Sequence, residues 1–281
     1  MSSDYSEVVQ TAREYYNSED ADNFYFIVWG GEDLHIGIYY RDDESIYDAS
    51  QRTMEHMIEH VDLGRDDYVL DLGGGYGGSA RFLAKRFGCR VVVLNLSEVE
   101  NERDREMNKE QGLDHLIEVI DGDFENLDYP DETFTRVWSQ DAILHSGNRE
   151  RVVAEAARVL KPGGSFIFTD PMQADNCPEG VLQPILERIH LDTLGSPAFY
   201  KEAGAKAGLE FVDFEAHHDQ LPRHYGRVRE ETMKADESGI LEGKVSKAYI
   251  ERMLTGLGHW IEGGQNGHLD WGIFHFRKPN G

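Results

Sequence analysis

The sequence predicts an α/β fold in which a mostly parallel, seven-stranded sheet carries helices on both faces. Short apolar runs alternate along the chain with helical patterns, and this alternation is typical of parallel sheets. The first apolar run ends at Asp71, and a glycine-rich turn at 73–78 then leads into a helical pattern. A strand, a tight glycine turn and a helix in this order form a unit that binds nucleoside-containing cofactors.

The individual elements follow from the same patterns. Strands are expected at residues 68–72, 90–94, 117–120, 136–139, 165–169, 210–215 and 271–277. Helical patterns between them cover residues 78–87, 98–111, 149–159, 181–191 and 197–207. The last strand alternates apolar and polar side chains, as an inserted antiparallel strand could.

Four segments are predicted. Residues 1–63 form a leader, an expected lid over the substrate site, with helical patterns at 8–16 and 45–60 and an aromatic, apolar run at 24–29. Residues 64–216 form the cofactor-binding core. Residues 217–264 are polar and helix-capable, and they are too long for a plain loop, which predicts an inserted helical cap. Residues 265–281 supply the final strand of the core sheet.

Composition narrows the class of protein. The 281 residues include 53 acidic side chains against 28 Lys and Arg, a net charge of −25, which argues against nucleic-acid or anionic-membrane partners. The acidity is dispersed along the chain and would suit a salt-rich cytoplasm, where screening relieves self-repulsion. Two cysteines and the lack of a signal peptide or long apolar run predict a cytoplasmic protein. A monomer or a homodimer is expected.

No metal site is expected, because the 12 histidines and two cysteines lack metal-ligand spacing. His217 and His218 are interpreted as a chance surface pair.

The glycine turn fits two cofactor classes. Gly73-x-Gly75-x-x-Gly78 satisfies the dinucleotide fingerprint, but the run Val69-Leu-Asp-Leu-Gly-Gly-Gly-Tyr-Gly77 more closely resembles the first motif of class I methyltransferases. Further matches to that family follow at 122–124, 134–139 and 160–164. The resemblance implies a Rossmann-like fold and S-adenosylmethionine as the cofactor.

Cofactor ligands are expected at the carboxyl ends of the strands. Asp71 can meet the amino acid end of the cofactor or order the glycine loop, and Asp123 with Phe124 can hold the adenine. Asn95 stands where most of these enzymes carry an acid for the ribose hydroxyls, a departure that an amide can accommodate. The full set of expected cofactor residues is Asp71, Gly73, Gly75, Asn95, Leu96, Asp123, Phe124, Gln140, Ile36 and Gly37.

The string Asp141-Ala-Ile-Leu-His145 predicts the catalytic pair. On a helical turn the two side chains would share a face, so the carboxylate could support an imidazole that accepts a proton or orients an amine. The string also resembles the dyad of phosphoethanolamine-type N-methyltransferases.

The leader, the Asn95-Leu96-Ser97 strand end and the cap together resemble the sarcosine/dimethylglycine N-methyltransferases, which make glycine betaine, an osmoprotectant. The resemblance implies a small-molecule amine as substrate. Tyr25 is a catalytic candidate, and its ring and that of Trp29 could face the growing cation. The expected substrate residues are Trp29, His35, Arg41, Met172 and Tyr200; for a substrate carboxylate, Arg41, Arg188, Arg223 and Arg227 remain open.

Three other functions remain at this stage. A phosphoethanolamine-type N-methyltransferase or a C-methyltransferase would share the core, and Arg223, Arg227 and Arg229 in the expected cap leave a phosphobase acceptor open. An NAD-dependent oxidoreductase is a more remote alternative, since no Tyr-x-x-x-Lys motif supports it. A subunit that binds the cofactor without turnover is the third.

Overall fold

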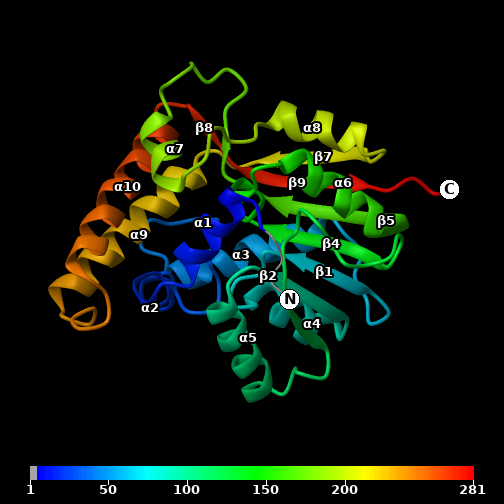
Figure 1. Cartoon of the computed structure of the whole chain (residues 1–281), viewed down its shortest axis with the longest axis horizontal. Helices are drawn as coiled ribbons and strands as arrows, with labels where there is room; N and C mark the ends of the chain where they lie inside the picture. Colours follow the sequence, from blue (N-terminus) through cyan, green and yellow to red (C-terminus); the bar gives the residue numbers. More distant parts are fainter. Residues whose placement is uncertain (1–4) are drawn as a thin grey trace.

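One seven-stranded sheet forms the centre of the molecule (Figure 1). The computed structural model describes residues 5–281, and the strand order is β3-β2-β1-β4-β5-β9-β7. The strands are β1 (Tyr68–Leu72), β2 (Arg90–Asn95), β3 (Ile117–Asp121), β4 (Phe134–Gln140), β5 (Leu160–Thr169), β7 (Glu210–Ala216) and β9 (Gly272–Arg277). β1 to β5 pair in parallel, whereas β9 runs antiparallel to both β5 and β7. The predicted fold class is confirmed.

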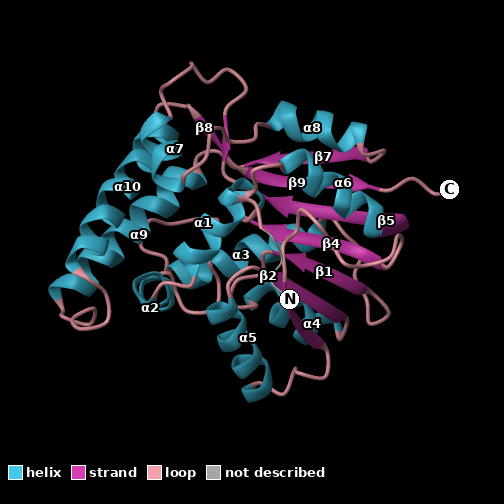
Figure 2. Cartoon of the chain, viewed as in Figure 1, coloured by secondary structure: helices cyan, strands magenta, loops and turns pink. Residues whose placement is uncertain are grey.

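Helices cover both faces of this sheet (Figure 2). Strand residues alternate between the faces, so Val69 of β1 packs in the cluster of α3 (Ile46–Glu59) and α4 (Gly78–Phe87). Leu70, the next residue, packs in the cluster of α6 (Arg149–Val159) and α8 (Pro197–Lys206). Helix α5 (Glu98–Glu110) contacts β2 and β3. The central strands are therefore buried on both faces, as their continuous apolar runs predict.

A separate layer of helices lies beyond the carboxyl ends of the strands. It contains α1 (Glu7–Tyr16), α2 (Glu19–Val28), α7 (Gln183–Ile189), α9 (Gln220–Glu237) and α10 (Lys247–Gln265). In Figure 1 the blue N-terminal helices lie between the sheet and the pair α9–α10. The hydroxyls of Tyr15 in α1 and Tyr249 in α10 lie 2.8 Å apart and connect these two helices. The leader and residues 217–264 thus meet, and residues 1–4 of the leader lie outside the described part.

The structure also contains elements that the sequence patterns did not predict. Helix α2 replaces the unassigned aromatic run at 24–29, and Ser18 caps it by accepting from the Ala21 N–H. A short ribbon pairs β6 (Met172–Gln173) with β8 (Leu269–Asp270), and a 3₁₀ turn, η1, covers Ile143–His145. Within residues 5–281, no helix combines the length and apolar character that crossing a membrane requires.

Candidate active site

The glycine turn between β1 and α4 forms the floor of a pocket at the carboxyl ends of the strands. Gly73 and Gly75 have φ angles of +72° and +54°, which side-chain-bearing residues rarely adopt. A Cβ atom on Gly74 would lie 2.6 Å from Cγ1 of Val93, so the turn also packs too closely for a side chain. The first turn of α4 leaves backbone N–H groups facing this side, as a bound ligand with acceptor groups requires.

Asp71 lies beneath this turn without a partner for one oxygen. Its side chain is 1% exposed, and Oδ2 makes no hydrogen bond within the described residues. Burial, helped by the charge of Asp104, raises the pKa of Asp71 to about 7. A buried carboxyl oxygen that has no partner in the described residues can accept a hydrogen bond from a bound ligand.

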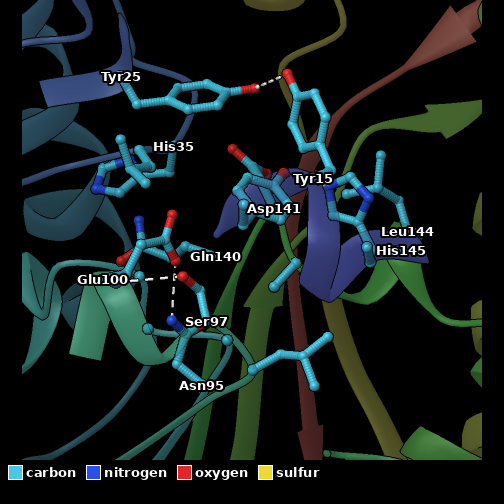
Figure 3. A pocket seen from close by; sticks show the side chains of 18 of the residues that line it. Tyr15, Tyr25, His35, Asn95, Ser97, Glu100, Gln140, Asp141, Leu144 and His145 are labelled. Atoms are coloured by element: carbon cyan, nitrogen blue, oxygen red, sulfur yellow. Dashed lines mark hydrogen bonds between the residues drawn. The ribbon is translucent and has the colours of Figure 1, made fainter. Parts of the chain in front are cut away.

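A buried acid that the sequence patterns did not indicate lies beside the end of β2. Asn95 donates from Nδ2 to Oε2 of Glu100 at 2.9 Å, and both residues line the pocket (Figure 3). Glu100 is 3% exposed, and burial raises its pKa to about 7. The carboxylate that β2 lacks is thus present in the first turn of α5. The N-cap Ser97, which accepts from the Glu100 N–H, is the sequence signal that fixes this turn.

The adenine candidates Asp123 and Phe124, and the further cofactor candidate Gln140, also line the pocket. Asp123 accepts from the Glu125 N–H at 2.8 Å, and Phe124 lies beside it. Gln140 Oε1 accepts from the Trp138 indole at 3.0 Å, while Gln140 Nε2 is buried without a partner within residues 5–281. Leu96 and Ile36 complete the expected cofactor residues that lie on the wall.

Asp141 occupies the centre of the pocket but not a helix. Its φ angle is +52°, and the following 3₁₀ turn begins only at Ile143. The carboxylate accepts from the Ile36 N–H at 2.6 Å and from the Trp271 indole at 2.7 Å. Burial raises its pKa despite these hydrogen bonds. Asp141 therefore ties the leader and the residue before β9 to the end of β4.

The predicted shared helical face of Asp141 and His145 is wrong. The imidazole Nε2 lies 2.8 Å from the Tyr16 hydroxyl, while the Asp141 oxygens are taken by Ile36 and Trp271. Burial, with the nearby Arg149 charge, lowers the pKa of His145 to about 4. His145 is therefore neutral near pH 7 and is held by a tyrosine rather than by a carboxylate.

Aromatic side chains line the end of the pocket away from Asn95 (Figure 3). The Tyr15 and Tyr25 hydroxyls are 3.2 Å apart, and the Tyr25 and Trp29 ring centroids are separated by 5.2 Å. Burial lowers the pKa of His35, but the Asp33 carboxylate, 3.6 Å from Nε2, raises it overall. The aromatic wall comprises Tyr15, Tyr16, Tyr25, Trp29, Tyr225 and Trp260.

Arg188 is the arginine that reaches this pocket. It is half-buried in α7, with its guanidinium against Met253 and Gly256 of α10. Within the described residues it forms no ion pair, whereas Arg223 is paired with Asp42, and Arg227 with Glu230 and Glu231. The sequence alone does not choose which of these arginines binds a substrate carboxylate, whereas the structure distinguishes them by their location and their ion-pair partners.

Four predicted site residues lie off the pocket wall. Arg41 is 71% exposed and paired with Asp43. The Tyr200 hydroxyl donates to Asp170 at 2.5 Å, and Asp170 in turn accepts from the Leu144 N–H, so this pair supports the turn that carries His145. Met172 is buried in the core beside β5.

Gly37 is the fourth of these residues. Its N–H donates to His224 Nδ1, and an added Cβ would lie 2.5 Å from Cβ of Ala49, so close packing on α3 explains the glycine.

Comparisons with known proteins identify the family. A model of the methyltransferase domain matches residues 70–168, from β1 to β5. Over 97% of each chain, the sequence is 63% identical to a sarcosine/dimethylglycine N-methyltransferase of Halorhodospira halochloris. The chain belongs to the sarcosine/dimethylglycine N-methyltransferase family.

Other relatives of this family agree. The enzyme of the same name from Aphanothece halophytica is 52% identical over 97% of this chain and 98% of its own. The solved structure of a proposed sarcosine dimethylglycine methyltransferase from Galdieria sulphuraria is 41% identical, with a TM-score of 0.89 over 95% of this chain and all of the other. As a member of this N-methyltransferase family, the chain uses S-adenosylmethionine as its cofactor. Within residues 5–281, Oδ2 of Asp71 and Nε2 of Gln140 have no partner, and these two groups beside the glycine turn fit the ammonium and carboxylate of the cofactor's amino acid end.

Proposed function

We propose that this enzyme transfers methyl groups from S-adenosylmethionine to the amines of sarcosine and dimethylglycine, so that glycine betaine is the final product. The family relationship supports this acceptor class. The observation that carries the proposal is the acceptor end of the pocket, where Arg188, which forms no ion pair within the described residues, lies near the aromatic wall. An N-methylated amino acid has one carboxylate and one amine, which match these two features.

The proposed cofactor contacts follow the polar end of the pocket. Asp71 accepts from the ammonium of the cofactor, and Glu100 with Asn95 binds the ribose hydroxyls. Asp123 meets the adenine edge, and Phe124 packs on its face. Gln140, whose Oε1 accepts from the Ser79 hydroxyl in the first turn of α4, binds the amino acid end. The N–H groups at the start of α4 complete the binding of the amino acid end.

Arg188 is proposed to bind the acceptor carboxylate. A guanidinium can hold a carboxylate through two parallel hydrogen bonds, which fixes the orientation of the amine as well as its position. Met253 and Gly256 restrict the side chain to this location. The rings of Tyr25 and Trp29 then stabilise the positive charge that develops on nitrogen.

The chemistry needs little from the protein beyond alignment. When bound, S-adenosylmethionine supplies a methyl group activated by its sulfonium. The chain's residues hold a neutral amine in line with that methyl and exclude water. Such alignment can lower the activation barrier by roughly 7–11 kcal/mol. His145 has a pKa near 4, so its role in this proposal is to position Tyr16 and the amine rather than to take a proton. The proton released after sarcosine methylation passes to solvent.

The leader (1–63) and the cap (217–264) are proposed to act as a lid and roof over this small-molecule site. The contact between α1 and α10 through Tyr15 and Tyr249, and the hydrogen bond from the Ile36 N–H of the leader to Asp141, support closure by these segments. We propose a cytoplasmic monomer or homodimer without nucleic-acid or membrane partners, in keeping with the net charge of −25.

An acceptor panel tests the function. Labelled S-adenosylmethionine is supplied with glycine, sarcosine, dimethylglycine, phosphoethanolamine or a lipophilic phenol, and transfer to each acceptor is measured. We expect transfer to sarcosine and dimethylglycine, with betaine as the end product. Preference for phosphoethanolamine or the phenol would refute the acceptor assignment while leaving the cofactor assignment intact.

A further inference from the structure

Three histidines converge on one glutamate between α3 and the end of β7. His56 and His60 come from the end of α3, Glu215 lies near the end of β7, and His217 follows that strand. His56 Nδ1 and His217 Nε2 lie 3.1 and 2.7 Å from Oε1 of Glu215. His60 Nε2 lies 2.7 Å from the other oxygen, Oε2. None of these four side chains lines the cofactor pocket.

The local structure fixes these four side chains. His56 and His60 are four residues apart, so they share one face at the end of α3, and Glu215 and His217 share one face of an extended segment. The His217 N–H donates to the Trp271 carbonyl at 2.8 Å, which pins that segment to the sheet. The sequence indicated a surface pair at 217 and 218, but the structure leaves His217 half-buried while His218 is exposed.

The chemistry of the cluster suits a transition-metal ion. The ligand atoms of His56, Glu215 and His217 all lie within 4.8 Å of one another, close enough for one ion to reach all three. The Nε2 atom of His56 lies 3.1 Å from the Tyr40 hydroxyl, a partner that can orient a metal-bound ring.

We propose that His56 Nδ1, His217 Nε2 and Glu215 Oε1 bind one divalent transition-metal ion, such as Zn²⁺ or Co²⁺. His60 holds the second carboxylate oxygen and so turns the first toward the ion. Two imidazoles and a carboxylate are a common ligand set for Zn²⁺, and water can take the fourth position because the cluster is partly exposed. The ion would cross-link the leader to the edge strand of the core sheet.

Metal binding to the full chain, with no affinity tag and after chelator treatment, tests this proposal. Titration calorimetry with zinc chloride should give one equivalent bound, and Co²⁺ should give the intense visible absorption of a four-coordinate site. Saturating Zn²⁺ should raise the melting temperature by about 5 °C, because the ion binds only the folded arrangement.

Variants locate the site. His56→Ala and His217→Ala should each abolish the stoichiometric binding, and His60→Ala should weaken it by about 10–100-fold, as loss of an outer partner does. His218→Ala, next in sequence and exposed, is the matched control and should bind as the parent does. The melting shift with S-adenosylhomocysteine reports the fold of every variant.

Two results would overturn the proposal. The first is binding that His56→Ala or His217→Ala leaves unchanged in a variant that still responds to S-adenosylhomocysteine. The second is seen with the parent chain alone and needs no variant. It is either the absence of stoichiometric binding or a Co²⁺ spectrum typical of six-coordinate geometry. Either result would make the cluster a set of hydrogen-bonded ion pairs that joins α3 to β7.

Discussion

Replacing Arg188 by methionine should remove recognition of the acceptor carboxylate. Methionine keeps the apolar packing on Met253 and Gly256 but cannot donate. Two hydrogen bonds to a charged group are lost, and because Arg188 is only half-buried we take the lower value of about 1.5 kcal/mol for each. The total of about 3 kcal/mol corresponds to a rise of about 100-fold in KM for dimethylglycine.

The assay compares acceptors with and without a carboxylate. Initial rates are measured with dimethylglycine and with trimethylamine, in which hydrogen replaces the carboxylate, for the parent and the Arg188→Met variant. The change should raise KM for dimethylglycine alone. Arg188→Lys keeps the charge without the planar fork and should give an intermediate loss.

Arg41→Met is the matched control, since Arg41 is exposed and paired with Asp43. An equal rise in KM for both amines, or no change for either, would refute the role of Arg188, provided that S-adenosylhomocysteine still raises the melting temperature.

Further predictions concern pH, the imidazole and salt. Because burial raises the pKa of Asp71 to about 7, the folded chain holds that proton more tightly than the unfolded chain, and this contribution to stability is lost as pH rises from about 4 through 7. Without cofactor, the melting temperature of Asp71→Asn should therefore be higher than that of the parent at pH 8, yet S-adenosylhomocysteine should raise it less. A variant that is no more stable than the parent at pH 8 would contradict the burial argument. His145→Gln should lower kcat equally for sarcosine and dimethylglycine, whereas a selective loss with sarcosine would restore His145 as a proton acceptor. The melting temperature should rise from dilute buffer to molar salt, because a net charge of −25 repels itself, and a flat curve would remove the argument for a saline host.

Local patterns were sufficient for the sheet and the cofactor end. Apolar runs and the glycine turn are properties of neighbouring residues, so β1, β2 and α4 lie where periodicity predicts them. Helix α2 also has a local start signal in the sequence, because Ser18 precedes an acidic first turn.

The acceptor end could not be predicted in the same way. The partners of Asp141 come from Ile36 and Trp271, which are 105 and 130 residues away, and the partner of His145 is Tyr16, 129 residues away. Spacing within the string 141–145 says nothing about such contacts. The choice of Arg188 among the arginines likewise depends on how α7 packs against α10.

The place of β9 in the sheet affects how the protein can mature on the ribosome. The strand is made after β5 and β7, yet it lies between them, and Phe274 and Phe276 stack on Phe168. While residues 272–277 are still inside the exit tunnel, β7 has no neighbour and the Phe168 ring has lost its cover. A nascent or stalled chain therefore displays an aromatic strip and a bare strand edge, which are features that chaperones bind, and the sheet is completed only once residues 272–277 have left the tunnel.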